Sequence, residues 1–360
     1  MLQHDLWAAF DWCCWSVNRD SPRIENLRVH LAGALRRLAL AKEEIVSLQD
    51  NYEDTIHANI ARPTFSREAP LTPFLPVDLF DPKGPWVCVS VQTPPLDATA
   101  SVHVSSFGGR SAFLVFIRLP GGRQETLSYL EQLNTFSEPF VHDRKRFEEL
   151  VGGSVEEHDM RWSALTSHGP PWVNPKTPQF PPETQLALVR QMIAIDNNGQ
   201  LIPTSITEDV QLRVCTSIDQ EHPGDDQQMF CEFRLSRVDL FAGKTGGLRP
   251  VASDETGFTM FGDHGIDRLE LPGFKGVRKD MLNCTNCHAK VGIHSMLSCA
   301  QFLPPKSLKP PLLTEITPEK VRAEAISWKA NNYSWGLLQG LALNKTNLKK
   351  CAENRQTAKN

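Results

Sequence analysis

TQLALVRQMIAIDNNG (184–199) is the stretch that decides the fold. Up to Asp196 it is rich in apolar and β-branched residues, a composition typical of a buried β-strand. The turn at 197–199 then predicts a hairpin, because Asn and Gly tolerate positive φ. Two more strand-like runs follow, separated by the turn-rich HPGDDQ (222–227): DVQLRVCTSI (209–218) and QMFCEFRLSRVDLF (228–241). The sequence therefore predicts an antiparallel β meander that forms one face of a sandwich or barrel.

The segments on either side of this meander differ from it in periodicity. Between Leu27 and Leu38 leucines recur every three or four residues, which is the spacing of one helix face. Six prolines between Pro63 and Pro85 exclude a regular element there. At 360 residues the chain exceeds one ordinary domain, and we predict an α+β multidomain protein with six segments. They are a helical region at 1–62, a proline-rich linker at 63–85, an α+β region at 86–168, a proline-rich connection at 169–182, the antiparallel β meander at 183–262 and a helical C-terminal segment at 263–360.

Further elements are predicted around the proline clusters. Strand-like runs of β-branched or aromatic residues occupy 86–91, 100–105 and 112–119. The leucines of 127–133 have helical spacing. Thr317 followed by Pro318 has the features of a helix start, namely a hydroxyl N-cap and a proline in the first turn. WGLLQGLAL (335–343) is apolar and helix-like, so the C-terminal segment is expected to be helical.

Composition and charge exclude several classes of protein. Hydrophobic residues make up 40% and charged residues 22%, the balance of a folded chain with apolar cores. The net charge of -4 excludes the binding of polyanions through bulk charge. No stretch approaches the ~18–20 apolar residues that span a bilayer, so no transmembrane segment is expected. The N-terminus lacks a basic region and places Asp5 and Asp11 beside its apolar residues, so no signal peptide is predicted.

CTNCH (284–288) is the segment that specifies chemistry. Two cysteines three positions apart, followed at once by a histidine, form the attachment pattern for c-type haem. Cys284 and Cys287 can each add to one haem vinyl group, and His288 can coordinate the iron as the proximal ligand. Over this segment and the following Gly292, the chain resembles a c-type cytochrome.

This resemblance implies one covalent haem c, with its iron, bound in the C-terminal segment at 263–360. It implies electron transfer or a haem-based redox role within a larger assembly, so the partner would be a redox protein or complex. It favours an electron carrier over an enzyme, and peroxidase-like activity is expected only if the distal haem position is open. It also implies a periplasmic or otherwise extracytoplasmic location, although no signal peptide is visible; without haem the expected location is cytoplasmic.

Several residues are candidates for the sixth iron ligand. Downstream of the motif the chain offers only His294 and Met296. The upstream candidates are Met260, His264 and Met281. We favour His264 because it lies in FGDHGID (261–267), a loop whose glycines let the backbone come close to the haem. An open or water-bound position is the alternative.

A zinc site is the second interpretation of the same cysteines. Cys284, Cys287, His294 and Cys299 provide four ligands of the kind that tetrahedral zinc takes. Their spacing resembles a retroviral-type zinc knuckle, although six residues precede the histidine here and four in the knuckle. The protein would then be a zinc-stabilised interaction or nucleic-acid-binding protein. Nucleic acid is disfavoured because 345–360 holds no aromatic side chain to stack on a base. A cofactor-free scaffold is the third interpretation.

Two further expectations concern burial. Cysteines in apolar surroundings should be small buried side chains: Cys13, Cys14, Cys88, Cys215 and Cys231. Apolar residues near Cys284 and Cys287 should form the walls of the haem pocket, and they are expected from among Leu282, Val291, Ile293, Leu297, Trp335, Leu337 and Leu338.

Overall fold

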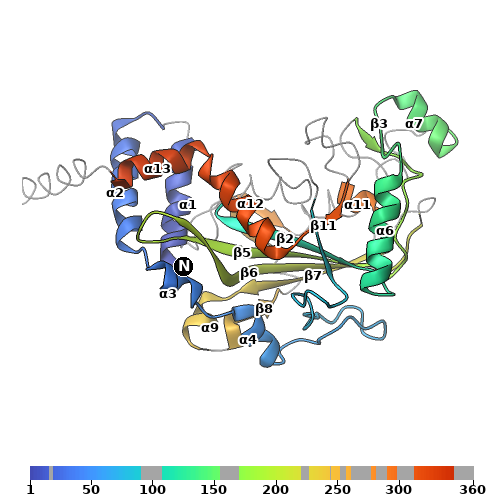
Figure 1. Cartoon of the computed structure of the whole chain (residues 1–360), viewed down its shortest axis with the longest axis horizontal. Coiled ribbons are helices and arrows are strands. Elements are labelled where there is room, and N and C mark those ends of the chain that lie inside the picture. Colours follow the sequence, from blue (N-terminus) through green and yellow to red (C-terminus); the bar gives the residue numbers. More distant parts are fainter. Residues whose placement is uncertain are drawn as a thin grey trace, which may run out of the picture.

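The computed structural model describes residues 1–15, 19–90, 108–154, 170–219, 227–243, 245–251, 257–260, 277–280, 290–297 and 312–343 (Figure 1). The helices are α1 (Leu2–Trp15), α2 (Pro22–Arg37), α3 (Lys42–Val46), α4 (Asn51–His57), α6 (Arg123–Thr135), α7 (Arg144–Val151), α9 (Arg237–Phe241), α11 (His294–Leu297), α12 (Pro318–Ala330), α13 (Tyr333–Leu343) and the 3-10 helix η2 (Thr245–Gly247). The strands are β1 (Val87–Ser90), β2 (Ser111–Arg118), β3 (Phe140–Val141), β4 (Trp172–Val173), β5 (Gln185–Ile195), β6 (Leu201–Cys215), β7 (Gln228–Leu235), β8 (Leu248–Pro250), β9 (Gly257–Met260), β10 (Val277–Asp280) and β11 (Thr314–Glu315).

A seven-stranded sheet in the order β11-β1-β2-β5-β6-β7-β8 organises these elements. Every pairing in it is antiparallel. The hairpin predicted at 197–199 joins β5 to β6, where the Asp196 backbone N–H donates to the Gln200 carbonyl at 2.9 Å. At one edge, β11 from the C-terminal part of the chain pairs with β1 through Val89 and Glu315. The prediction of an α+β protein with an antiparallel β-rich middle is confirmed.

Several helices form where the sequence predicts them. α1 to α4 occupy the N-terminal region, and α6 contains the leucines of 127–133. Ser21 and Thr317 each precede a proline, and their hydroxyls accept the backbone N–H groups of Ile24 and Lys320, both at 3.3 Å. These bonds satisfy donors that the first helical turn leaves unpaired.

Strand β7 ends and strand β6 begins at other residues than the sequence predicts. The run 228–241 does not stay extended, because β7 ends at Leu235 and α9 begins at Arg237. The Ser236 hydroxyl accepts the Asp239 backbone N–H at 3.3 Å and caps this short helix. β6 starts at Leu201, earlier than the predicted 209, and its pairing with β5 shifts register twice. Such bulges bend a strand and increase its twist.

Side chains on the two faces of the sheet differ in chemistry. On one face, called the apolar face, a buried cluster includes Leu114, Val189, Val210 and Phe233. Tyr52 of α4 and Val321 of α12 pack into this cluster. The opposite face holds a second cluster, in which strand residues such as Leu186 meet α6 and α11. Further along the strands, that opposite face is charged.

The two ends of the sheet are covered by different helices (Figure 1). At the β5–β6 hairpin end, α1, α2 and α13 pack on Ile193 and Ile195 in a third buried cluster. At the other end, α6 and α11 contribute Leu133, Ile293 and Leu297 to the cluster on the second face. CTNCH (284–288) precedes α11 in the chain, and the described residues that follow this segment lie at the α11 end of the sheet.

Candidate functional site

Most of the sequence-predicted site residues lie outside the described residues. This group comprises Cys284, Cys287, His288, His264, Met281, Cys299 and Leu282. Met260 ends strand β9, where it pairs with Val277, in agreement with its strand-like surroundings. His294 and Met296 lie on α11. The structure therefore shows the segment that follows the CTNCH motif, beginning at Lys290, two residues after His288.

Three side chains hold that segment against the sheet. Gln228 Nε2 donates to the Lys290 carbonyl at 2.5 Å, and Gln179 Oε1 accepts the Ile293 N–H at 2.8 Å. Arg213 Nη1 donates to the Ser295 hydroxyl at 3.0 Å. Because these residues come from the start of β7, the loop before β5 and the end of β6, they fix the segment to one end of the sheet.

Gly292 is required for this close approach. Its φ is +53°, a left-handed conformation that favours glycine. A Cβ at this position would overlap the Gln179 amide, which holds the Ile293 N–H, and would lie 3.1 Å from Ile218 Cδ1. Any larger residue would therefore loosen the chain just after the motif.

His294 is completely buried, at 0% exposure. Its neighbours Ile293 and Leu297 belong to the apolar cluster with α6. A buried imidazole of this kind suits a metal ligand, but the other three members of the predicted zinc set lie outside the described residues. Within the described ranges, no group of three or more His, Cys, Asp or Glu side chains is arranged to hold a metal ion.

The predicted walls of the haem pocket do not come together. Ile293 and Leu297 pack with α6, whereas Trp335 and Leu338 pack with α1 and α2 at the hairpin end. Figure 1 shows α11 and α13 over opposite ends of the sheet. These candidates therefore lie in two separate clusters, because α13 packs on the hairpin end of β5. That the walls come from among them stays a prediction, since Cys284 and Cys287 lie outside the described residues.

A row of charged residues crosses the middle of the second face. Arg190, Asp209, Arg234 and Arg249 are cross-strand neighbours on β5, β6, β7 and β8, and we call them the charged row. The first three are buried, with exposures of 5–7%. Arg234 Nε lies 4.0 Å from Asp209 Oδ2. Buried charges are costly unless paired, so this row constrains how the face is covered.

Glu232 joins the charged row from β7. Its Oε1 accepts from Arg234 Nη2 at 2.6 Å and from Nε at 3.0 Å. Burial, followed by the negative charge of Asp209, raises the pKa of Glu232 to about 8, although Arg234 opposes the shift. With this raised pKa the Glu232 carboxyl retains its proton near neutral pH. The charged row therefore contains an acid, Glu232, that can exchange a proton in the physiological pH range.

Glu232→Gln should remove a pH dependence of stability. Between about pH 5 and 8 the unfolded chain releases the Glu232 proton while the folded chain keeps it, so the free energy of unfolding falls as pH rises. Glutamine cannot ionise, so the variant should lack this slope and be the more stable protein near pH 8. Urea midpoints measured across that range test this. Glu25→Gln, on an exposed face of α2, is the control, and equal slopes in E232Q and the unmodified protein would contradict the assignment.

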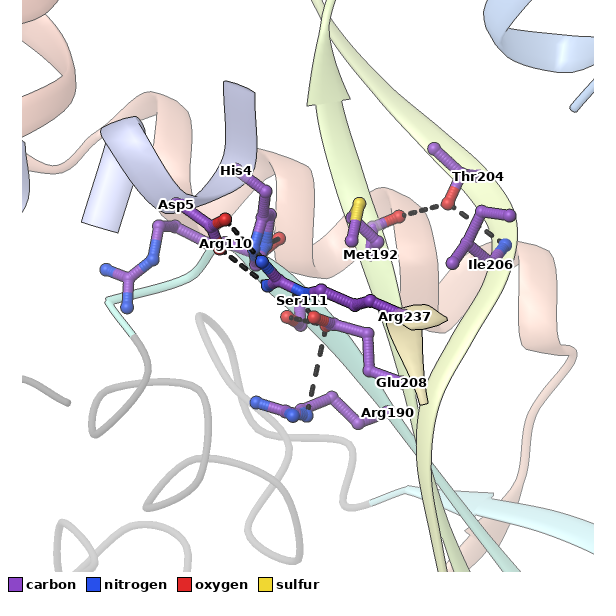
Figure 2. A network of polar contacts seen from close by, with 10 residues as sticks. All are labelled: His4, Asp5, Arg110, Ser111, Arg190, Met192, Thr204, Ile206, Glu208 and Arg237. Atoms are coloured by element: carbon purple, nitrogen blue, oxygen red, sulfur yellow. Dashed lines mark hydrogen bonds and ion pairs between the residues drawn. The ribbon is translucent and has the colours of Figure 1, made fainter. Parts of the chain in front are cut away.

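A buried polar network lies beside the charged row (Figure 2). Ser111 donates to Glu208 Oε2 at 2.7 Å, and Arg190 Nε lies 3.9 Å from the same oxygen. His4 Nδ1 is 3.8 Å from Glu208 Oε1, and His4 Nε2 is 3.1 Å from the Arg110 carbonyl. Ser111 is 0% exposed, so its hydroxyl is closed to substrates. The network fixes α1 to the sheet and does not form a nucleophilic triad.

Two further contacts in Figure 2 stabilise the surroundings of this network. Both guanidinium Nη atoms of Arg237 pair with Asp5, which ties α9 to α1. Thr204 Oγ1 donates to the Met192 carbonyl at 2.8 Å and accepts the Ile206 N–H at 3.1 Å. Thr204 thereby satisfies backbone groups where the β5–β6 pairing is irregular.

A second buried charge cluster lies near α12. Lys329 Nζ donates to Asp11 Oδ2 at 2.8 Å, to the Gly108 carbonyl at 2.7 Å and to the Ser334 hydroxyl at 3.3 Å. Arg110 Nη1 donates to the same Asp11 oxygen at 2.8 Å. Burial lowers the pKa of Lys329, although Asp11 opposes the shift. Since all three Nζ donors are engaged, Lys329 holds the structure together and is not a nucleophile.

The described cysteines behave as buried apolar residues. Cys13, Cys14, Cys88 and Cys215 are buried and Cys231 is half-buried, and these five are free cysteines. Burial raises the pKa of Cys14 to about 12, and of Cys215 and Cys231 to about 11. Thiols with raised pKa values are poor nucleophiles and metal ligands at neutral pH. The predicted burial is confirmed for Cys13, Cys14, Cys88 and Cys215, whereas Cys231 is only half-buried.

No family model, curated protein or solved structure matches this chain. In the part of the chain that the structure describes, none of the helices has the length and apolar character needed to cross a membrane.

The charged row was not predicted from the sequence. Arg190 and Arg234 each follow an apolar residue and Asp209 precedes one, a local pattern that normally indicates a solvent-facing side. The sequence signal is weak: Glu232 and Arg234 lie two positions apart on β7, and Asp209 and Arg213 lie four positions apart on β6, so charges of both signs share one face of neighbouring strands.

Proposed function

We propose that this chain carries one haem, attached through Cys284 and Cys287 with His288 as proximal ligand, and transfers electrons within a larger assembly. The observation that carries the proposal is the CTNCH segment at 284–288, because covalent haem attachment needs two thiols and a histidine in this order. Bound there, the haem would supply a one-electron iron couple. His264 is the proposed sixth ligand.

The anchoring of residues 290–297 supports this proposal. The segment that follows the motif is fixed at Lys290, Ile293 and Ser295 by side chains of the sheet. A redox centre works best when its ligands are held in place before electron transfer, so that little reorganisation accompanies the reaction. The anchor therefore provides a rigid support within two residues of the proposed proximal ligand.

Zinc is the second candidate, and the burial of His294 is the observation that favours it. Zinc would use Cys284, Cys287, His294 and Cys299, and would leave His288 free of the metal. Haem would instead use His288 and leave His294 as a packed core residue. The two proposals thus make opposite predictions for the two histidines.

The test is a set of serine and alanine variants produced with an export signal in a host that attaches c-type haem. Haem predicts a pyridine haemochrome spectrum that survives denaturation, and its loss in the double variant Cys284→Ser/Cys287→Ser. His288→Ala should change the iron coordination, whereas His294→Ala should retain it. His264→Ala should abolish a low-spin oxidised spectrum if His264 is the sixth ligand. Cys351→Ser, outside both ligand sets, is the control.

If the site binds zinc, the chain produced without haem attachment should contain one metal ion. This ion should be lost in His294→Ala and Cys299→Ser and retained in His288→Ala. That result would overturn the haem proposal. A purified chain with neither covalent haem nor zinc would overturn both and leave a cofactor-free scaffold.

A further inference from the structure

A cavity of about 230 Å³ lies at the hairpin end of the sheet, far from α11. It is enclosed by α2, α13 and the β5–β6 hairpin, which lie side by side in Figure 1. Nothing in the proposed redox role uses this cavity. Its volume is below the ~300–1,000 Å³ of sites for drug-sized ligands, so it suits a smaller molecule.

The floor of the cavity is apolar and well packed. Leu35 of α2, Ile195 of β5 and Trp335 and Leu338 of α13 line it, and all four are buried in one cluster. Trp335 packs against Trp7, with ring centroids 5.7 Å apart. These large side chains are held by their neighbours, so the cavity is preformed. An apolar group that enters it would displace water from the floor.

The lining of the cavity includes one carboxylate, that of Asp196. Asp196, only 3% exposed, accepts the backbone N–H groups of Asn198 at 2.9 Å and Gln200 at 2.7 Å. Both bonds go to Oδ1. Among the described residues no hydrogen bond or ion pair occupies Oδ2, which leaves this oxygen to accept from a ligand. The turn fixes the carboxylate in place before any ligand arrives.

The lining also includes one cation, the guanidinium of Arg36. Arg36, an exposed residue of α2, donates through Nη1 to the Ala342 carbonyl at 2.8 Å, near the end of α13. Its guanidinium has further N–H donors. Within the part of the chain that is described, Arg36 forms no ion pair with an acid. Gln339, whose Nε2 donates to the Gly199 carbonyl at 3.2 Å, completes the rim.

We propose that this cavity binds a small zwitterion with an apolar side chain, such as a free apolar amino acid. Its carboxylate pairs with Arg36, its ammonium donates to Asp196 Oδ2, and its side chain lies on Leu35, Trp335 and Leu338. A cavity with one cation, one anion and an apolar floor matches this class of molecule in charge and in polarity. This site is independent of the haem or zinc proposed above, because α11 contributes no residue to its lining.

Calorimetric titration of the full chain with L-leucine and L-phenylalanine tests the proposal. Two analogues of leucine each lack one charge: 4-methylpentanoate has no ammonium, and 3-methylbutylamine has no carboxylate. We expect saturable binding of at least one amino acid and about tenfold weaker binding of each leucine analogue, since each loses one charged pair.

Variants locate the bound molecule. Arg36→Gln should weaken the binding of the amino acid and of 4-methylpentanoate but not that of 3-methylbutylamine. Asp196→Asn should weaken the binding of the amino acid and of 3-methylbutylamine but not that of 4-methylpentanoate. The asparagine oxygen can still accept the turn N–H groups, so the hairpin is retained. Leu338→Phe should block all ligands by filling the floor. Arg144→Gln on α7, at the opposite end of the molecule, is the control. The proposal is overturned if neither amino acid binds up to about 10 mM, or if these cavity variants bind as the control does.

Discussion

Asp11→Asn is expected to cost about 3–5 kcal/mol of unfolding free energy, because it leaves the buried cations Arg110 and Lys329 without their shared anion. Both cations are 0% exposed, and each donates to Asp11 Oδ2 at 2.8 Å. Domains of this kind have a total stability of about 5–15 kcal/mol, so the variant should be close to unfolding at room temperature. Urea unfolding followed by tryptophan fluorescence measures the effect.

Lys329→Met is the matched variant for this prediction. It leaves Asp11 and Arg110 as a balanced ion pair and replaces the ammonium by an apolar group over the Trp7 ring, which Lys329 Nζ now contacts at 5.0 Å. Its cost should be clearly smaller than that of Asp11→Asn. Without Asp11 the pKa of Lys329 loses its main raising influence, so D11N should regain stability as pH rises above neutrality. Equal costs for D11N and K329M would show that the charge balance does not matter.

Gly246→Ala is expected to cost about 3 kcal/mol or more. Gly246, in η2, has φ +66°, where a Cβ is strained. That Cβ would also overlap the Asn51 carbonyl oxygen and lie 2.5 Å from Thr55 Oγ1 and 2.8 Å from Thr55 N. Because two of these three atoms belong to the backbone of α4, they cannot rotate away, and α4 would have to move off the sheet.

The displacement of α4 would also break its main polar link to β6. The Asn51 side chain donates to the Thr207 carbonyl at 2.9 Å and accepts the Thr207 N–H at 2.7 Å, where β6 departs from regular pairing. Gly243→Ala is the control, because Gly243 has φ +68° but no atom within 4 Å of an added Cβ. Gly243→Ala should lower the free energy of unfolding by only about 1 kcal/mol. Thermal unfolding compares the two, and similar costs would mean that backbone strain alone accounts for the effect.

Local sequence patterns were sufficient to predict a strand or helix that is specified by its own residues. The run 184–199 gave β5 and its hairpin because alternation and the turn residues act over a few positions. Thr317 and Pro318 marked the start of α12 for the same reason. The prediction of a strand over 228–241 was wrong beyond Leu235, because the Ser236 hydroxyl offers the backbone a capping bond that competes with an extended strand.

The candidate site was only partly accessible to sequence reasoning. The haem proposal for CTNCH could be made from sequence because it depends on a short, fixed order of residues. The anchor next to this segment could not be predicted, because Gln179, Gln228 and Arg213 are far from it in the chain and none belongs to a motif. The candidate pocket walls show the same limit: sequence could not tell that Trp335 and Leu338 pack with α1 and α2, apart from Ile293 and Leu297.

The sequence by itself determined most of the helical and extended segments and the hairpin, because these depend on neighbouring residues, and the order of residues in CTNCH is the basis of the haem proposal. Only the tertiary structure decided that β11 joins the sheet edge and that Arg190, Asp209 and Arg234 are buried. Periodicity tells which side chains share a face, but not what covers that face. Burial in turn sets the pKa of Glu232 and makes Asp11 essential, since charges lose hydration only when distant parts of the chain pack around them.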